Sequence, residues 1–143
     1  NWEYCLIDSM WDKQIGYEKI KELCDHANSK NVGVLLWYNS AGDWNTVPYH
    51  PKDKLLTHES RMEEFSRLEA LGIKGIKVDF FGGDGQSMMD YYQDLLADAQ
   101  QPHHFLIVDE CHHFNGPDHI RSLPEHFTFR LGLSARASSA SNS

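Results

Sequence analysis

Basic residues are scarce in this sequence, where 13 lysines and arginines stand against 21 aspartates and glutamates for a formal net charge of -8. An acidic balance without a basic cluster argues against a surface for nucleic acid or an anionic membrane. No run approaches the roughly 18 apolar residues of a membrane-spanning helix, and no signal peptide is visible. We therefore expect no nucleic-acid partner and no membrane span.

Cysteine and the nucleotide-binding glycine motifs are also sparse. Cys5, Cys24 and Cys111 are odd in number, far apart and outside any CxxC spacing, which argues against a disulfide framework or a zinc site. The one glycine cluster, Gly82-Gly83-Asp84-Gly85, does not have the spacing of GxGxxG, and a Walker GK[ST] motif is missing. The sequence gives no support to a nucleotide-binding function.

What the sequence does contain is a regular alternation of short apolar runs and amphipathic segments. This order predicts strands joined by right-handed helical crossovers, and so an α/β fold with a parallel sheet. About four βα units correspond to a partial (β/α)8 TIM barrel, since a whole barrel needs ~250 residues. The expected strands are 4–8, 32–39, 73–81 and 105–109, and the expected helices are 13–28, 57–71 and one that Ser87 caps.

Acidic residues end three of these strands, at Asp8, at Asp79 and at Asp109-Glu110. Parallel strands bring their carboxyl ends to one edge of the sheet, which in barrels carries the chemistry. Recurring acids at that edge fit a barrel mouth better than a nucleotide site. We expect these carboxylates to gather there.

The expected strand around Asp79 holds a charged pair. Side chains alternate along a strand, so Lys77, Asp79 and Phe81 should share one face while Val78 and Phe80 lie on the other. Charges on a covered face cost stability unless they satisfy each other or open onto a cleft. The positive charge of Lys77 favours the ionised carboxylate of Asp79, which suits a nucleophile and not a proton donor. A purely structural Lys–Asp pair is the alternative.

Carboxylates together with aromatic side chains, without a nucleotide loop, predict sugar chemistry, because glycosidases use a pair of carboxyl groups. The segment 40–56 is long for a βα connection, and long ordered loops are usually functional. Trp44 in this loop is expected to contact substrate, whereas core packing is an equal alternative for Trp37. Trp37, Tyr38, Trp44 and Tyr49 are candidates to stack on pyranose faces, and Asn39 and Asp43 to bind hydroxyls.

The nine histidines offer a second hypothesis, a metal-dependent hydrolase. His103-His104 and His112-His113 flank the fourth expected strand, but neither pair has HExxH or another ligand spacing. We interpret them as a solvated surface cluster.

Four stretches of the sequence carry a family resemblance. Over residues 1 to about 100 they are similar to glycoside hydrolase family 97, which implies a catalytic (β/α)8 barrel flanked by β domains. Asp79 in Lys-Val-Asp-Phe-Phe resembles the nucleophile of the retaining α-galactosidases of that family, and its inverting α-glucosidases are the alternative. The stretches are Tyr4-Cys5-Leu6-Ile7-Asp8-x-x-Trp11, Leu36-Trp37-Tyr38-Asn39-Ser40, Gly72-Ile73-Lys74-Gly75-Ile76-Lys77-Val78-Asp79-Phe80-Phe81 and Asp84-Gly85-Gln86.

The resemblance also implies roles for residues around the nucleophile. Glu110 is similar in position to a glutamate that serves as base and calcium ligand in inverting relatives, so calcium is an implied cofactor. Glu110 is equally a candidate stand-in acid, or a solvated loop residue. With an oligosaccharide or α-glycoside as partner, the expected substrate-binding residues are Asp8, Trp37, Asn39, Trp44 and Lys77.

The C-terminal part departs from the family pattern. Arg130 stands where a glutamate is expected, and Arg136 stands near a second such position, so the family's proton donor is not visible. We expect 1–130 to be part of the catalytic domain and 131–143 to be a Ser/Ala-rich tail, disordered or frame-shifted. The start at Asn1, directly before a strand, predicts an internal piece of a longer protein that needs its flanking domains. A periplasmic or secreted location is implied by the resemblance, and an inactive carbohydrate-binding remnant is the alternative function.

Overall fold

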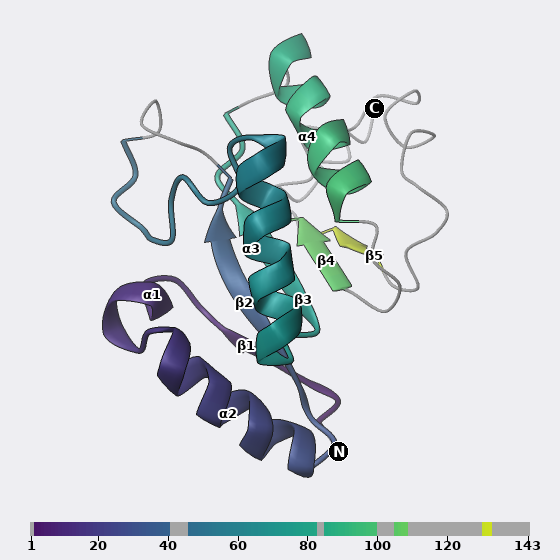
Figure 1. The fold of residues 1–143 in the computed structure, drawn as a ribbon. Coiled ribbons are helices and arrows are strands. Elements are labelled where there is room, and N and C mark those ends of the chain that lie inside the picture. Colours follow the sequence, from purple (N-terminus) through teal and green to yellow (C-terminus); the bar gives the residue numbers. More distant parts are fainter. Residues whose placement is uncertain (1, 41–45, 83–84, 100–104, 109–129, 133–143) are drawn as a thin grey trace, which may run out of the picture.

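The computed structural model describes residues 2–40, 46–82, 85–99, 105–108 and 130–132, which form one sheet with helices beside it (Figure 1). No helix among these residues is long and apolar enough to span a membrane. The strands are β1 (Tyr4–Ile7), β2 (Gly33–Asn39), β3 (Gly75–Asp79), β4 (Phe105–Val108) and β5 (Arg130–Gly132), and the helices are α1 (Trp11–Gln14), α2 (Tyr17–Ser29), α3 (His58–Leu71) and α4 (Gln86–Asp98).

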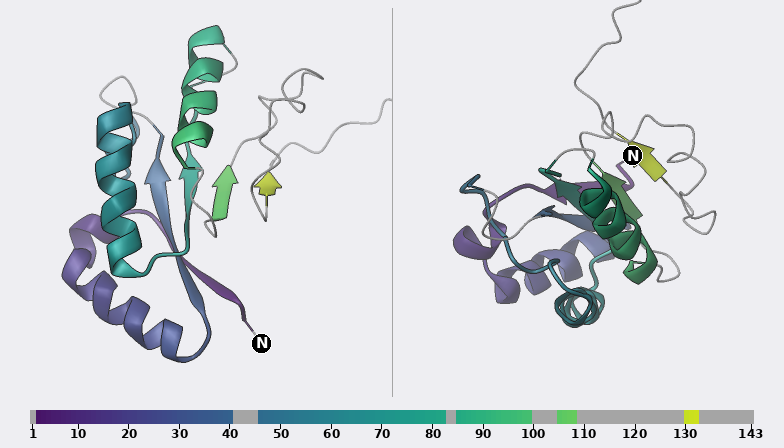
Figure 2. Two further views of the ribbon diagram at one scale, coloured as in Figure 1. Left: turned by 45° about the vertical axis from the view of Figure 1, so that its right-hand side comes forward. Right: turned by 90° about the horizontal axis from the view of Figure 1, so that it is seen from above.

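The five strands pair in chain order, β1-β2-β3-β4-β5, and every pairing is parallel. Figure 2 shows α2, α3 and α4 along one side of this sheet, as expected when successive crossovers turn in the same direction. A doubly wound sheet would carry helices on both faces and reverse its strand order. The predicted α/β class with parallel strands is confirmed. The strands of the sheet follow the chain order, so the sheet is singly wound.

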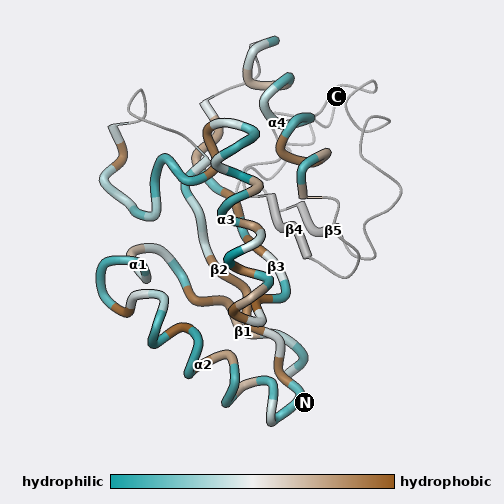
Figure 3. The backbone as a smooth tube through the Cα atoms, viewed as in Figure 1, coloured by the Kyte–Doolittle hydropathy of each residue, from teal (hydrophilic) through white to brown (hydrophobic). Residues whose placement is uncertain are grey.

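The hydrophobic core lies between the sheet and this helix layer. Figure 3 shows a hydrophobic run in the first half of β2, whereas β3, α2 and α3 alternate between hydrophobic and hydrophilic residues. Alternation along a strand sends every second side chain toward the helices. The core residues are Val34, Leu36, Tyr38, Ile76 and Val78 from the strands and, from the helices, Ile20, Cys24, Phe65, Leu68, Met89, Tyr92, Leu95 and Leu96 among others.

Local sequence signals fix both ends of α3. Thr57 Oγ1 accepts from Ser60 N at 3.2 Å, and Ser60 Oγ accepts from Thr57 N at 3.0 Å, which is a capping box. Gly72 ends the helix at φ 84°, a left-handed conformation that favours glycine. The predicted cap and stop are confirmed.

Two helix boundaries differ from the prediction. The helix expected over 13–28 is divided into α1 and α2, because Gly16 has φ 79° and interrupts the helical path. Ser87 does not cap α4, since Gly85 is the N-cap residue and the helix begins at Gln86. The predicted cap was two residues too late.

The alternation predicted around Asp79 ends at that residue. β3 stops at Asp79, and Phe80 has φ 62°, in the left-handed region. This turn puts the Phe80 and Phe81 side chains on the faces opposite to those that the alternation predicts. Phe81 joins the core beside Tyr92, and Phe80 lies beside Trp37, so the predicted faces of Phe80 and Phe81 are wrong.

β5 lies where no element was predicted. It pairs with β4 in the register Leu106 with Arg130 to Val108 with Gly132. The strand includes Leu131 and Gly132, the first two residues of the expected tail. The rest of that tail lies outside the described residues.

Candidate active site

Four predicted site residues meet at the carboxyl ends of β2 and β3. In the strand register Trp37 is paired with Lys77, and Asn39 with Asp79. Paired residues of neighbouring strands point to the same face. Because Leu36, Tyr38 and Val78 face the helices, these four residues face the opposite side.

The Asp79 carboxylate is oriented by three groups. Its Oδ1 accepts from Phe80 N at 2.8 Å, and its Oδ2 accepts from Trp37 Nε1 at 3.4 Å. Lys77 Nζ lies 3.6 Å from the same Oδ2. The side chains of Lys77 and Asp79 keep 14% and 15% of their surface exposed. The predicted pair exists, and it remains open to solvent.

Trp37 reaches the Asp79 carboxylate from the neighbouring strand β2. It is 2% exposed, its backbone oxygen accepts from Trp11 Nε1 at 2.8 Å, and its ring lies edge-on to Phe80 at 5.9 Å. With so little of its surface exposed, Trp37 offers its indole N–H to Asp79 and does not present a ring face to solvent. Tyr38, also a stacking candidate in the sequence, is buried on the helix face, and that prediction is wrong.

Asn39 is buried and binds the segment that follows β2. Its backbone N donates to Pro51 O at 3.0 Å, and its Nδ2 donates to Tyr49 O at 3.2 Å. These bonds hold Tyr49 beside the end of β3, where its ring stacks on Phe80. Asn39 thus positions an aromatic side chain within the site.

Asp8 lies at the carboxyl end of β1, the neighbour of β2. It is exposed, and its Oδ1 accepts from Ser9 N at 2.7 Å. This places a further acid at the same edge of the sheet, as predicted from the strand ends.

Ser40 and Phe80 belong to the site but were missed as site residues. Ser40 N donates to Asp79 O at 2.9 Å, and its Oγ donates to Phe80 O at 2.9 Å. Both bonds hold the chain where β3 turns into its loop. The only sequence signal for Ser40 was its place directly after Asn39 in the family-like motif.

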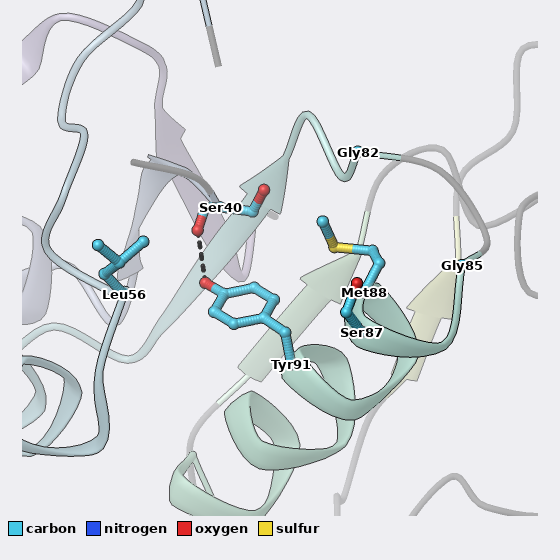
Figure 4. A pocket seen from close by; sticks show the side chains of 7 residues that line it. All are labelled: Ser40, Leu56, Gly82, Gly85, Ser87, Met88 and Tyr91. Carbon is cyan, nitrogen blue, oxygen red and sulfur yellow. Dashed lines mark hydrogen bonds between the residues drawn. The ribbon is translucent and has the colours of Figure 1, made fainter. Parts of the chain in front are cut away.

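A pocket of about 420 Å³ lies beside this turn, between the end of β2 and the start of α4 (Figure 4). The Tyr91 hydroxyl lies 2.5 Å from Ser40 O and 2.9 Å from Leu55 O. Burial raises the Tyr91 pKa, so the hydroxyl stays a neutral donor. The pocket is lined by Ser40, Leu56, Gly82, Gly85, Ser87, Met88 and Tyr91.

A second carboxylate, Glu64 of α3, is enclosed on the helix side of β2. It is 2% exposed and accepts from the Tyr17 and Tyr38 hydroxyls, each at 2.6 Å. Arg67 Nη1 lies 3.6 Å from its other oxygen. These contacts connect α2, β2 and α3, and so stabilise the strand that carries Trp37 and Asn39.

Several predicted residues lie outside the described residues: Trp44, Asp43, Glu110 and the two histidine pairs. Within the described part of the chain, no group of three or more His, Cys, Asp or Glu side chains could hold a metal ion.

Comparison with known proteins gives relatives of one kind. A probable retaining alpha-galactosidase of Streptomyces bingchenggensis is 29% identical over 118 residues, covering 74% of this chain and 16% of that protein. A retaining alpha-galactosidase of Bacteroides thetaiotaomicron is 37% identical over 95 residues, 60% of this chain and 12% of that protein. This chain thus spans less than a fifth of either relative.

A solved structure that is similar to this chain is also that of a glycosidase. The crystal structure of a beta-arabinopyranosidase superposes with a TM-score of 0.71 at 43% sequence identity, covering 74% of this chain and 17% of that one. The family model for Glycoside hydrolase 97 matches residues 3–128. With most of its length matched, this chain belongs to the glycoside hydrolase 97 family.

Proposed function

We propose that this chain forms part of the (β/α)8 catalytic barrel of a retaining glycosidase in which Asp79 is the nucleophile. The sequential parallel order of β1 to β5, with α2, α3 and α4 on one face, supports a segment of barrel wall. On this proposal the open face that carries Trp37 and Lys77 lines the barrel interior, and flanking domains complete the protein.

The observation that carries the proposal is the position of the Asp79 carboxylate. It lies at the carboxyl end of a parallel strand, the end at which barrel enzymes carry their catalytic groups. Phe80 N, Trp37 Nε1 and Lys77 Nζ fix its orientation, and the group stays partly exposed. A carboxylate that is held but reachable suits attack on a bound sugar.

In the proposed reaction, one Asp79 oxygen forms a bond to the anomeric carbon while the bond to the leaving oxygen breaks. A second carboxyl group protonates that oxygen, which leaves as an alcohol. Water then attacks the anomeric carbon, gives its proton to the second group and restores the Asp79 carboxylate. Two displacements at one carbon retain the anomeric configuration, and they require carboxyl groups ~5–5.5 Å apart.

We assign the second carboxyl to Glu110, which lies outside the described residues. Calcium, with Glu110 as an implied ligand, stays part of the proposal. Asp8 and Trp44 complete the proposed substrate contacts, and the buried Asn39 acts through Tyr49, whose carbonyl it binds.

The named relatives support a galacto-configured substrate. Two are named for alpha-galactosidase activity and one for beta-arabinopyranosidase activity. A β-L-arabinopyranoside has the ring configuration of an α-D-galactopyranoside and lacks only the hydroxymethyl group. We therefore propose these two glycosides as the substrate class, ahead of α-glucosides, whose 4-hydroxyl is equatorial.

The test uses the full-length protein that carries these residues, with aryl α-D-galactopyranoside and aryl β-L-arabinopyranoside. NMR of the first product should show the anomer of the substrate. Asp79→Gly should be inactive, and azide should restore turnover and give a glycosyl azide of inverted configuration. Asp94→Asn, an exposed acid on α4, is the matched control.

An inverted first product, or unchanged turnover by Asp79→Gly, would remove Asp79 as nucleophile. Sugar binding without hydrolysis of either glycoside by the native protein would favour the carbohydrate-binding remnant.

A further inference from the structure

Tyr49 is a large aromatic residue that stays exposed although its surroundings hold it firmly. Its exposed fraction is 47%. Its carbonyl accepts from Asn39 Nδ2 at 3.2 Å, and its ring stacks on Phe80 with 6.0 Å between centroids and 12° between planes. A single exposed aromatic side chain is ordinary on a protein surface. Tyr49, however, is held in place by the parallel ring of Phe80 and by the buried amide of Asn39, so its exposed ring is a preformed surface for a ligand.

Phe80 supports Tyr49 through an unusual backbone conformation. A left-handed φ of 62° is uncommon for a bulky residue without a functional reason. This conformation directs the Phe80 ring away from the core and places it between Trp37, at 5.9 Å and 74°, and Tyr49. Ser40 Oγ, which donates to Phe80 O, holds the turn. The three rings form a connected series from the buried indole to the exposed Tyr49.

Two short routes connect Tyr49 with Asp79. Phe80 follows Asp79 directly and donates its N–H to the carboxylate. Asn39, which binds the Tyr49 carbonyl, is the register partner of Asp79 on β2. The exposed ring therefore belongs to the edge at which Asp79 offers its carboxylate.

We infer that Tyr49 is a specificity-determining platform on which the apolar face of the substrate sugar stacks, and that Phe80 positions it. The axial 4-hydroxyl of a galacto-configured ring leaves its C–H bonds at positions 3, 4 and 5 on one face. That face matches the flat, electron-rich surface of an aromatic ring. The equatorial 4-hydroxyl of a glucoside interrupts it. The inference depends on the proposed function only for the choice of sugar.

The experiment measures binding in the Asp79→Asn background of the full-length protein, so that no turnover is needed. Calorimetry with methyl α-D-galactopyranoside and methyl β-L-arabinopyranoside is compared with methyl α-D-glucopyranoside. Tyr49→Ala should weaken binding of the first two about tenfold, and Tyr49→Phe should change it less than about twofold. Trp2→Ala, an exposed aromatic residue before β1, should have no effect.

Phe80→Gly tests the support separately, because glycine keeps the left-handed backbone and the N–H to Asp79 while it removes the ring. It should weaken binding about as much as Tyr49→Ala. Circular dichroism melting checks each fold, and Tyr49→Leu replaces Tyr49→Ala if the alanine variant unfolds.

Unchanged binding by Tyr49→Ala, or equal weakening by Tyr49→Phe, would overturn the platform, and unchanged binding by Phe80→Gly would overturn its support. Hydrolysis by the native protein is scored independently. Tyr49-dependent binding without hydrolysis rejects the proposed function and keeps the platform, whereas hydrolysis with Tyr49-independent binding does the reverse.

Discussion

Glu64 and Asp79 are two carboxylates with similar partners on opposite sides of the same sheet. Each accepts from an aromatic donor, Tyr17 and Tyr38 for Glu64 and Trp37 for Asp79, and each has one cation 3.6 Å away. They differ in access, because Glu64 is 2% exposed and the Asp79 side chain 15%. Partner chemistry alone therefore does not distinguish the two acids. Access to solvent at the strand end does, and it is the reason that Asp79, and not Glu64, is proposed as the catalytic carboxylate.

The largest expected effect is on activity at Asp79. Asp79→Asn in the full-length protein should lower kcat by a factor on the order of 10³ or more, because no other group replaces the proposed nucleophile. Its melting temperature should stay close to that of the native protein, since the side chain is only partly buried. Initial rates and thermal melts of the same samples measure both quantities. A large loss of stability with retained rate would mean that Asp79 resembles Glu64.

Glu64 should show the opposite pattern. Glu64→Gln should lower the free energy of unfolding by about 3 kcal/mol, because a buried polar group loses its charge-assisted bonds to two hydroxyls. The rate per folded molecule should be kept. Urea unfolding measures the change, with Glu63→Gln as control, an exposed acid that bonds Arg67 and should cost less than about 1 kcal/mol. Equal losses in the free energy of unfolding for Glu64→Gln and Glu63→Gln would contradict the structural role of the buried Glu64.

Trp37 and Trp11 provide a finer comparison of two buried indole donors. Trp37→Phe removes the N–H that reaches Asp79 and keeps most of the ring, so kcat should fall about three- to tenfold with little change in KM. Trp11→Phe removes a bond to the Trp37 carbonyl, and should cost about 1 kcal/mol of stability at unchanged kcat. Steady-state kinetics and urea unfolding of both variants separate the roles. Equal changes in kcat and in stability for the two variants would mean that Trp37 does not position the Asp79 carboxylate.

The smallest expected effect is on the pH dependence of stability, through the buried Tyr38 on the helix side of the sheet. Burial, and then the charge of Glu64, raise the pKa of the Tyr38 hydroxyl above its ordinary value. The unfolded tyrosine loses its proton near pH ~10 while the folded one keeps it, so stability is full below that pH and falls above it. Urea unfolding between roughly pH 9 and 11 should show a steeper fall for the native chain than for Tyr38→Phe. Equal slopes would mean that the Tyr38 hydroxyl does not stay protonated in the fold.

Local and periodic signals explain what the sequence could predict. Thr57 and Gly72 define α3 through contacts within a few residues, and alternation along β3 put Lys77 and Asp79 on one face. The missed features depend on contacts between distant segments. Nothing near Phe80 in the sequence requires a left-handed residue, and its turn is held by Ser40, which directly follows β2. β5 has three residues and acquires its identity from pairing with β4.

The register of β3 on β2 has a consequence for how this region tolerates insertions and deletions. A shift of one residue would turn Lys77 and Asp79 toward the core residues Leu36 and Tyr38, and would present Val78 at the open edge instead. Loss of function and loss of folding would then come from the same event. The length of β3 is therefore constrained twice, by the core residues on one face of the sheet and by the position of Asp79 on the other.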